Sequence, residues 1–145
     1  MPSLEKSDVI KDVLTTLINI SGRKTNKGHA ISTMHQSINK LKDKYNFLKH
    51  IQIKDTRFLE YNDFVSVMSD INSVKSDEVG EAIYDIIKTI NFELGKDAGH
   101  FFVKEVKSNL DDDYRLVLEE MGLDLGLIQL EYEISELEKK LKSEK

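Results

Sequence analysis

The sequence contains no cysteine, and its single proline is Pro2. The absence of cysteine excludes disulfides, thiolate metal sites and cysteine nucleophiles, and it is typical of proteins from a reducing compartment. There is no run of about 18 apolar residues that could span a bilayer. The first ten residues, MPSLEKSDVI, lack the apolar centre of a signal peptide. We therefore expect a soluble, cytoplasmic protein that does not enter a membrane.

Catalytic motifs are also missing. The sequence has no Gly-x-Ser-x-Gly elbow, no His-Glu-x-x-His pair and no dinucleotide-binding glycine pattern. The stretch SGRKTNKGHA, residues 21–30, has the glycines and cations of a phosphate-binding loop, but His29 follows Gly28 where the motif requires lysine, and the preceding segment is helical rather than extended. We expect a protein without enzymatic activity and without a cofactor.

A metal site is not expected either. Asp111, Asp112 and Asp113 are adjacent, but they lack the alternating ligands and distal glutamate of an EF-hand loop. Acidic residues are favoured at a helix N-terminus, where they cap the helix and complement its dipole. One alternative stays open, because histidines that meet in space could hold a metal or exchange protons.

Apolar residues recur at helical spacing over most of the chain. A chain of 145 residues fits one domain, residues 1–145. The first helix is expected to begin behind Ser7 as N-cap and to end at Gly22. The further helices are expected over residues 30–45, 76–95, 96–110, 111–122 and 123–142.

Between the second and third helices the pattern changes to a period of two. FLKHIQIK, residues 47–54, alternates from Lys49 onward, and FVSVM, residues 64–68, is rich in strand-forming residues. The sequence therefore predicts an α+β fold that is mostly helical, with about six helices and one small antiparallel β-hairpin between helices two and three.

The last helix, residues 123–142, carries the sharpest pattern. Its aliphatic residues are spaced 4, 3, 4, 3, 4, which is a narrow heptad seam that suits one partner helix. The seam consists of Leu123, Leu127, Leu130, Ile134, Leu137 and Leu141. Two interpretations remain open: the seam packs onto its own chain, or it forms a parallel or antiparallel homodimer. For the homodimer, the contact residues are expected to be Leu127, Leu130, Ile134, Leu137 and Leu141.

The net charge of −5 conceals a basic segment. Residues 23–57 contain nine cations and two acids, whereas residues 58–145 contain ten cations and twenty-one acids. The residues expected to contact an anionic partner are Arg23, Lys24, Lys27, Lys40 and Lys44. Three interpretations of the segment compete: a solvated face balanced by the acidic part of the chain, an acidic protein partner, and a nucleic-acid surface of loosely winged-helix type.

One stretch resembles a known kind of domain. ELGKDAGHFFVKEVKSNL, Glu93 to Leu110, is similar to helical pieces of small archaeal signalling output domains. The resemblance implies a noncatalytic regulatory module, and it transfers no functional residue. Together with the seam and the basic segment, it leads us to expect a regulatory or protein-interaction module that self-associates through its last helix and contacts an anionic partner.

Overall fold

The computed structural model describes residues 5–53, 65–99 and 102–143. Side chains are described for all of these except residues 96–99 and 143. In chain order the elements are α1 (Lys6–Lys24), α2 (Lys27–Leu41), the 3-10 helix η1 (Asn46–His50), β1 (Ile51–Ile53), β2 (Val65–Val67), the 3-10 helix η2 (Ser69–Ser73), α3 (Ser76–Gly99), α4 (Phe102–Asn109), α5 (Asp112–Glu120) and α6 (Leu125–Ser143). The expected mostly helical α+β fold, with a two-stranded antiparallel sheet between the second and third helices, is confirmed.

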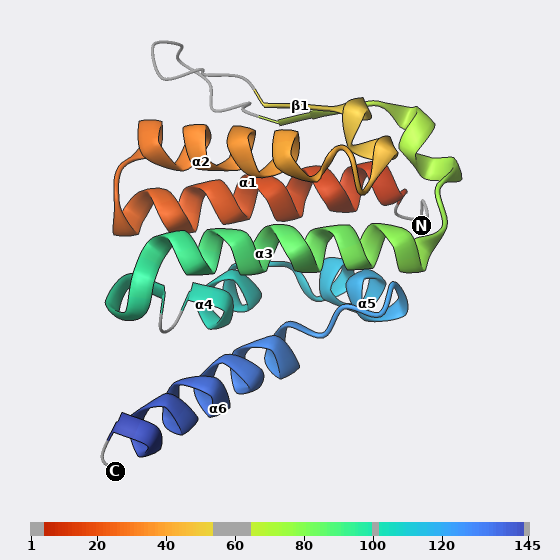
Figure 1. Cartoon of the computed structure of the whole chain (residues 1–145). Coiled ribbons are helices and arrows are strands. Elements are labelled where there is room, and N and C mark those ends of the chain that lie inside the picture. Colours follow the sequence, from red (N-terminus) through yellow and green to blue (C-terminus); the bar gives the residue numbers. More distant parts are fainter. Residues whose placement is uncertain (1–4, 54–64, 100–101, 144–145) are drawn as a thin grey trace.

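Helix α1 lies at the centre of the core and touches α2, α3, α4, α5, η2 and β2. The hairpin lies at one end of the view in Figure 1, and α6 lies at the other end, beyond α3, α4 and α5. Apolar side chains of α1 recur every three or four residues, so they line a broad face that is covered on several sides. Those buried in α1 are Val9, Ile10, Val13, Leu14, Leu17, Ile18 and Ile20.

Both ends of α1 differ from the expectation. The N-cap is Glu5, without a side-chain cap bond, and Ser7 lies inside the helix. The Ser7 N–H instead donates to Oδ1 of Asn72 in η2, at 2.8 Å. At the other end the helix continues through Gly22 to Lys24, because glycine ends a helix only where the backbone turns left-handed, and Gly22 does not have a positive φ.

The hairpin is shorter than the sequence pattern suggested. Only three residues in each strand pair, with Ile51 opposite Val67 and Ile53 opposite Val65. The preceding residues form η1, and Leu48 in η1 is buried, which explains why this residue did not fit the alternation. The connection expected over residues 55–63 lies outside the described residues.

The second half of the chain is divided at two glycines with positive φ. Gly95 (φ 81°) kinks α3, close to the end predicted for that helix, and Gly122 (φ 87°) separates α5 from α6. Asp111 occupies the N-cap position of α5 as expected, but its side chain makes no cap hydrogen bond. In the first turn of α5, Asp112 instead pairs with Arg115.

A third glycine sets the spacing between two helices. Gly80 of α3 faces the backbone at the end of α5, where a Cβ would lie 2.2 Å from the carbonyl oxygen of Met121. Glycine therefore allows the two elements to approach more closely than any side chain would permit.

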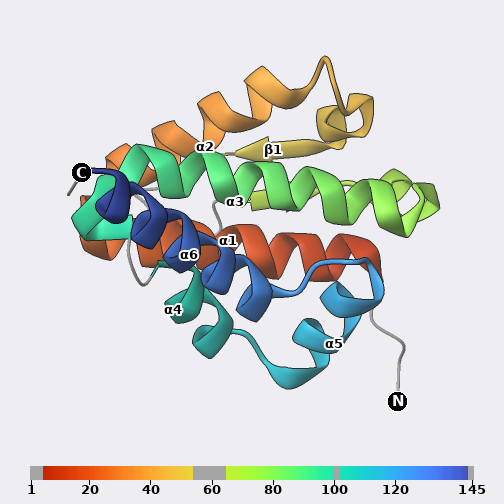
Figure 2. The ribbon, with the colours of Figure 1, turned by 60° about the horizontal axis from the view of Figure 1, so that its bottom comes forward.

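Helix α6 follows α5 in the chain and crosses the face of the molecule that comes forward in Figure 2. It contacts α4 along its first turns. Within the described residues, none of the helices is both long enough and apolar enough to cross a bilayer.

Candidate functional site

Helix α6 has two different faces. Its inner face carries Leu125, Ile128 and Gln129, all buried, and the half-buried Tyr132. The side-chain oxygen of Gln129 accepts a hydrogen bond of 3.2 Å from the backbone N–H of Lys104 in α4. Gln129 and Tyr132 thus belong to the face that docks α6 onto the domain.

The opposite face of α6 presents an apolar strip. At about 100° per residue, the positions in this strip lie roughly opposite the face that docks onto the domain. The exposed fractions of the side chains are 48–58%. We call this strip the outer seam; it consists of Leu127, Leu130, Ile134, Leu137 and Leu141. Of the six seam residues in the sequence, only Leu123 is buried, with 2% exposed, and it precedes the helix. Exposed aliphatic residues are common singly, but five in register on one helix form a continuous apolar strip.

A groove runs between α6 and the end of α3. It holds two adjoining hollows of about 480 Å³ and 340 Å³, both bordered by Asn91, Phe92 and Tyr132. Phe92 is 84% exposed, and the side-chain oxygen of the buried Asn91 has no hydrogen-bond partner among the described atoms. The sequence patterns did not indicate these residues. The signal in the sequence that could have indicated them was Phe92, an aromatic residue that lies off the apolar stripe of α3.

The five cations expected to contact an anionic partner do not form one cluster. Lys24 pairs with Glu105 of α4 at 2.7 Å, and Lys44 lies 3.1 Å from Asp85 of α3. Two of the five charges are therefore balanced inside the fold. Of the remaining three, Arg23 and Lys40 are exposed, and Lys27 is half-buried in the first turn of α2.

The start of α2 was the point where an anion was expected to meet the helix amides. There, Oδ1 of Asn26 accepts a hydrogen bond from the His29 N–H at 2.8 Å. This N-cap hydrogen bond therefore occupies one of the backbone N–H groups that an anion would need at the start of α2. The middle of the stretch SGRKTNKGHA, at Thr25 and Asn26, is therefore a capped connection between α1 and α2.

Tyr45 and Asp85 form the tightest polar contact near the basic segment. The Tyr45 hydroxyl donates to Oδ2 of Asp85 at 2.6 Å, and the Lys44 ammonium lies 3.1 Å from the same oxygen. Burial, followed by the hydrogen bond to Asp85, raises the pKa of Tyr45 from 10.0 to about 12. The hydrogen bond to Asp85 likewise raises the pKa of Lys44.

This contact predicts a loss of stability in alkali. Below pH 10 Tyr45 keeps its proton in both the folded and the unfolded chain, so its contribution to the free energy of unfolding is fully present. Between pH 10 and about 12 the unfolded chain releases the proton first, and the free energy of unfolding therefore falls as pH rises. In Tyr45→Phe we expect a loss of about 1 kcal/mol at pH 7 from the missing hydrogen bond and a shallower decline above pH 10. Urea unfolding from pH 8 to 11.5 measures both; equal slopes in the two proteins would contradict the assignment.

The described side chains do not form a metal-binding cluster. Among the side chains that the structure describes, no group of three or more histidines, aspartates and glutamates could hold a metal ion. His29, His35 and His50 lie on different elements or turns, and His100 lies outside the described residues. The absence of enzymatic activity stays a prediction.

Comparisons with known proteins give no further guide. No family model, curated protein or solved structure matches the chain. The resemblance of residues 93–110 to signalling output domains therefore stays a prediction.

Proposed function

We propose that this chain is a noncatalytic interaction module that forms a homodimer through the outer seam of α6. The observation that carries the proposal is the position of five aliphatic side chains, each about half exposed, on the face of α6 turned away from its own domain. A heptad strip of this width suits a single partner helix.

The area available supports a dimer of modest affinity. Burying the outer seams of two copies against each other would remove on the order of 1,000 Å² from water, at the lower edge of specific interfaces. We therefore expect a dissociation constant of about 1–100 μM. A second copy supplies the matching strip without any other partner, and a two-fold axis makes such a contact close on itself.

The charges beside the outer seam favour an antiparallel pair. Glu131 and Glu138 lie on one flank of the seam, and Glu133 and Lys140 lie on the other. In an antiparallel pair each flank lies against the equivalent flank of the second chain. Glu133 then faces Lys140 of the other copy on one side, and Glu131 faces Glu138 of the other copy on the other side. In a parallel pair Glu133 faces Glu138 on both sides, without a compensating attraction. Antiparallel helices also oppose their dipoles favourably.

Charge reversal at one residue separates the two orientations. In the antiparallel dimer, Glu133→Lys places a lysine opposite Lys140 and should weaken association by about threefold to tenfold. In the parallel dimer it places a lysine opposite Glu138 and should strengthen association. Sedimentation equilibrium over a concentration series measures the change.

The matched control is the double variant Glu133→Lys with Lys140→Glu. It restores the opposite-charge pair in the antiparallel arrangement, so the dimer should regain its affinity. Glu133 also accepts a hydrogen bond from Gln129 at 3.1 Å within the chain. A loss caused only by that contact would persist in the double variant and would contradict the antiparallel assignment.

Contact with an anionic macromolecule, whether acidic protein or nucleic acid, is supported less well. The ion pairs that Lys24 and Lys44 form within the chain reduce the positive charge that this segment can offer to such a partner. We therefore place self-association first and do not require the basic segment for it.

A further inference from the structure

A second surface lies between α2 and the hairpin, at the other end of the view in Figure 1 from α6. It is a pocket of about 260 Å³. Its walls are formed by His35, Ile38 and Asn39 of α2, by Lys42 at the C-cap of that helix, and by Ile51, Gln52 and Ile53 of β1. The volume is slightly below the range of about 300–1,000 Å³ that is usual for drug-sized ligands, so it suits a smaller molecule.

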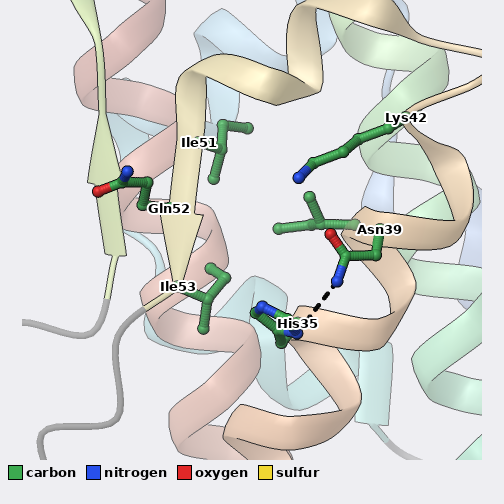
Figure 3. A pocket seen from close by; sticks show the side chains of 7 residues that line it. His35, Asn39, Lys42, Ile51, Gln52 and Ile53 are labelled. Atoms are coloured by element: carbon green, nitrogen blue, oxygen red, sulfur yellow. Dashed lines mark hydrogen bonds between the residues drawn. The ribbon is translucent and has the colours of Figure 1, made fainter.

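The polar groups of the pocket come from successive turns of one helix. His35, Asn39 and Lys42 are spaced by four and three residues, which places them on the same side of α2. Figure 3 shows the Lys42 ammonium and the Asn39 carbonyl oxygen directed into the space between α2 and β1. The His35 ring extends toward β1 below them.

His35 is oriented by its neighbour. Nδ2 of Asn39 lies 3.2 Å from Nδ1 of His35. Because an amide nitrogen can only donate, Nδ1 accepts this bond, and the neutral ring keeps its proton on Nε2. His35 therefore offers an N–H donor on the side of the ring away from Asn39.

Lys42 differs from the two basic residues that are neutralised within the fold. Lys24 and Lys44 each have a carboxylate at 3.1 Å or less. For Lys42, the described part of the chain supplies no acidic partner within ion-pair distance. A half-buried cation at a concave site attracts an anion more strongly than an isolated surface lysine does, because fewer water molecules screen it.

The remaining wall is aliphatic. Ile38 and Ile51 are buried, and Ile53 is half-buried at the end of β1. Gln52 also lines the pocket, with its side chain on the side of β1 away from His35 and Lys42 (Figure 3). The pocket thus combines an ammonium group, an imidazole N–H and the Asn39 carbonyl oxygen with the aliphatic side chains of three isoleucines.

From this arrangement we propose that the pocket binds a small organic carboxylate with an apolar body. The two carboxylate oxygens match the two donors, Lys42 and His35, and the body of the ligand lies against the three isoleucines. A phosphate group has more oxygens than the site has donors, and it would leave the apolar wall unused. This site goes beyond self-association and does not depend on it.

Phenylacetate is a suitable probe, with phenylacetamide as its uncharged counterpart of nearly the same shape. In a titration followed by ¹H–¹⁵N NMR, we expect saturable shifts confined to the amides of residues 35–42 and 51–53, with a dissociation constant of about 0.1–1 mM. Phenylacetamide should bind about tenfold more weakly or worse, because it cannot pair with the ammonium.

Two variants locate the charge that matters. Lys42→Met keeps the aliphatic stem and should weaken phenylacetate binding about tenfold. Lys40→Met, which removes an exposed cation two residues away on the same helix, should change the affinity less than about twofold.

Three results would overturn the proposal: no saturable shifts up to about 20 mM phenylacetate, equal losses in the two lysine variants, or tighter binding of inorganic phosphate than of phenylacetate. None of them bears on the α6 dimer, which is measured separately through its mass.

Discussion

Ile134→Asp should convert the dimer into a monomer. Ile134 lies at the middle of the outer seam, and in the antiparallel pair two introduced carboxylates would be buried in an apolar contact without partners. We expect association to weaken by about 100-fold or more. Because the Ile134 side chain is already 48% exposed in the single chain, the free energy of unfolding of the monomer should change by less than about 1 kcal/mol. Light scattering and circular dichroism on the same samples measure the two quantities.

Ile128→Asp is the matched control on the inner face of the same helix. Ile128 is 7% exposed and contributes to the docking of α6. The same substitution here should cost several kcal/mol of stability. Collapse of stability in Ile134→Asp would instead mean that the outer seam packs onto its own chain, and an unchanged mass with unchanged stability would exclude the seam as the dimer contact.

Gly80→Ala should destabilise the protein by about 2–4 kcal/mol, although alanine is the better helix former. The new Cβ would meet the Met121 carbonyl oxygen at 2.2 Å and its carbonyl carbon at 3.1 Å. Backbone atoms cannot rotate aside as a flexible side chain can, so α3 and the end of α5 would have to separate. The midpoint of urea unfolding measures the loss.

Gly22→Ala supplies the control, because it makes the same change near the end of another helix. Its Cβ would lie 3.4 Å or more from its nearest neighbours, which is ordinary contact. We expect a gain of about 0.5 kcal/mol from helix propensity. If both substitutions stabilised the protein to the same degree, the close approach of α3 to α5 would be wrong.

The parts of the fold that depend on local periodicity were predictable. The apolar repeats located the helices and the hairpin, and Gly95 and Gly122 were expected near helix ends, as observed. Helix ends determined by distant residues were not predictable. The sequence suggested Ser7 as a cap, whereas Asn72 fills that role from 65 residues away. Local pattern carries no information on a partner at that distance.

The candidate sites divide in the same way. The heptad spacing marked the outer seam, but only the packed structure shows that α6 docks through its other face. The basic segment was visible as composition, yet the pairing of Lys24 with Glu105 spans 81 residues and that of Lys44 with Asp85 spans 41. The pocket lined by His35 and Lys42 was not predictable, because it exists only where β1 returns beside α2.

The contact between α1 and η2 also bears on the order in which the protein assembles during synthesis. The first turn of α1 has no side-chain cap of its own, and it is held by Asn72 and by the bond of the Lys6 ammonium to the Val74 carbonyl oxygen. At about 5–20 residues per second, the ribosome needs about 3 to 13 seconds to add the 65 residues that separate Ser7 from Asn72. Until then the beginning of the central helix lacks these partners, so the core closes only after about half of the chain has been made.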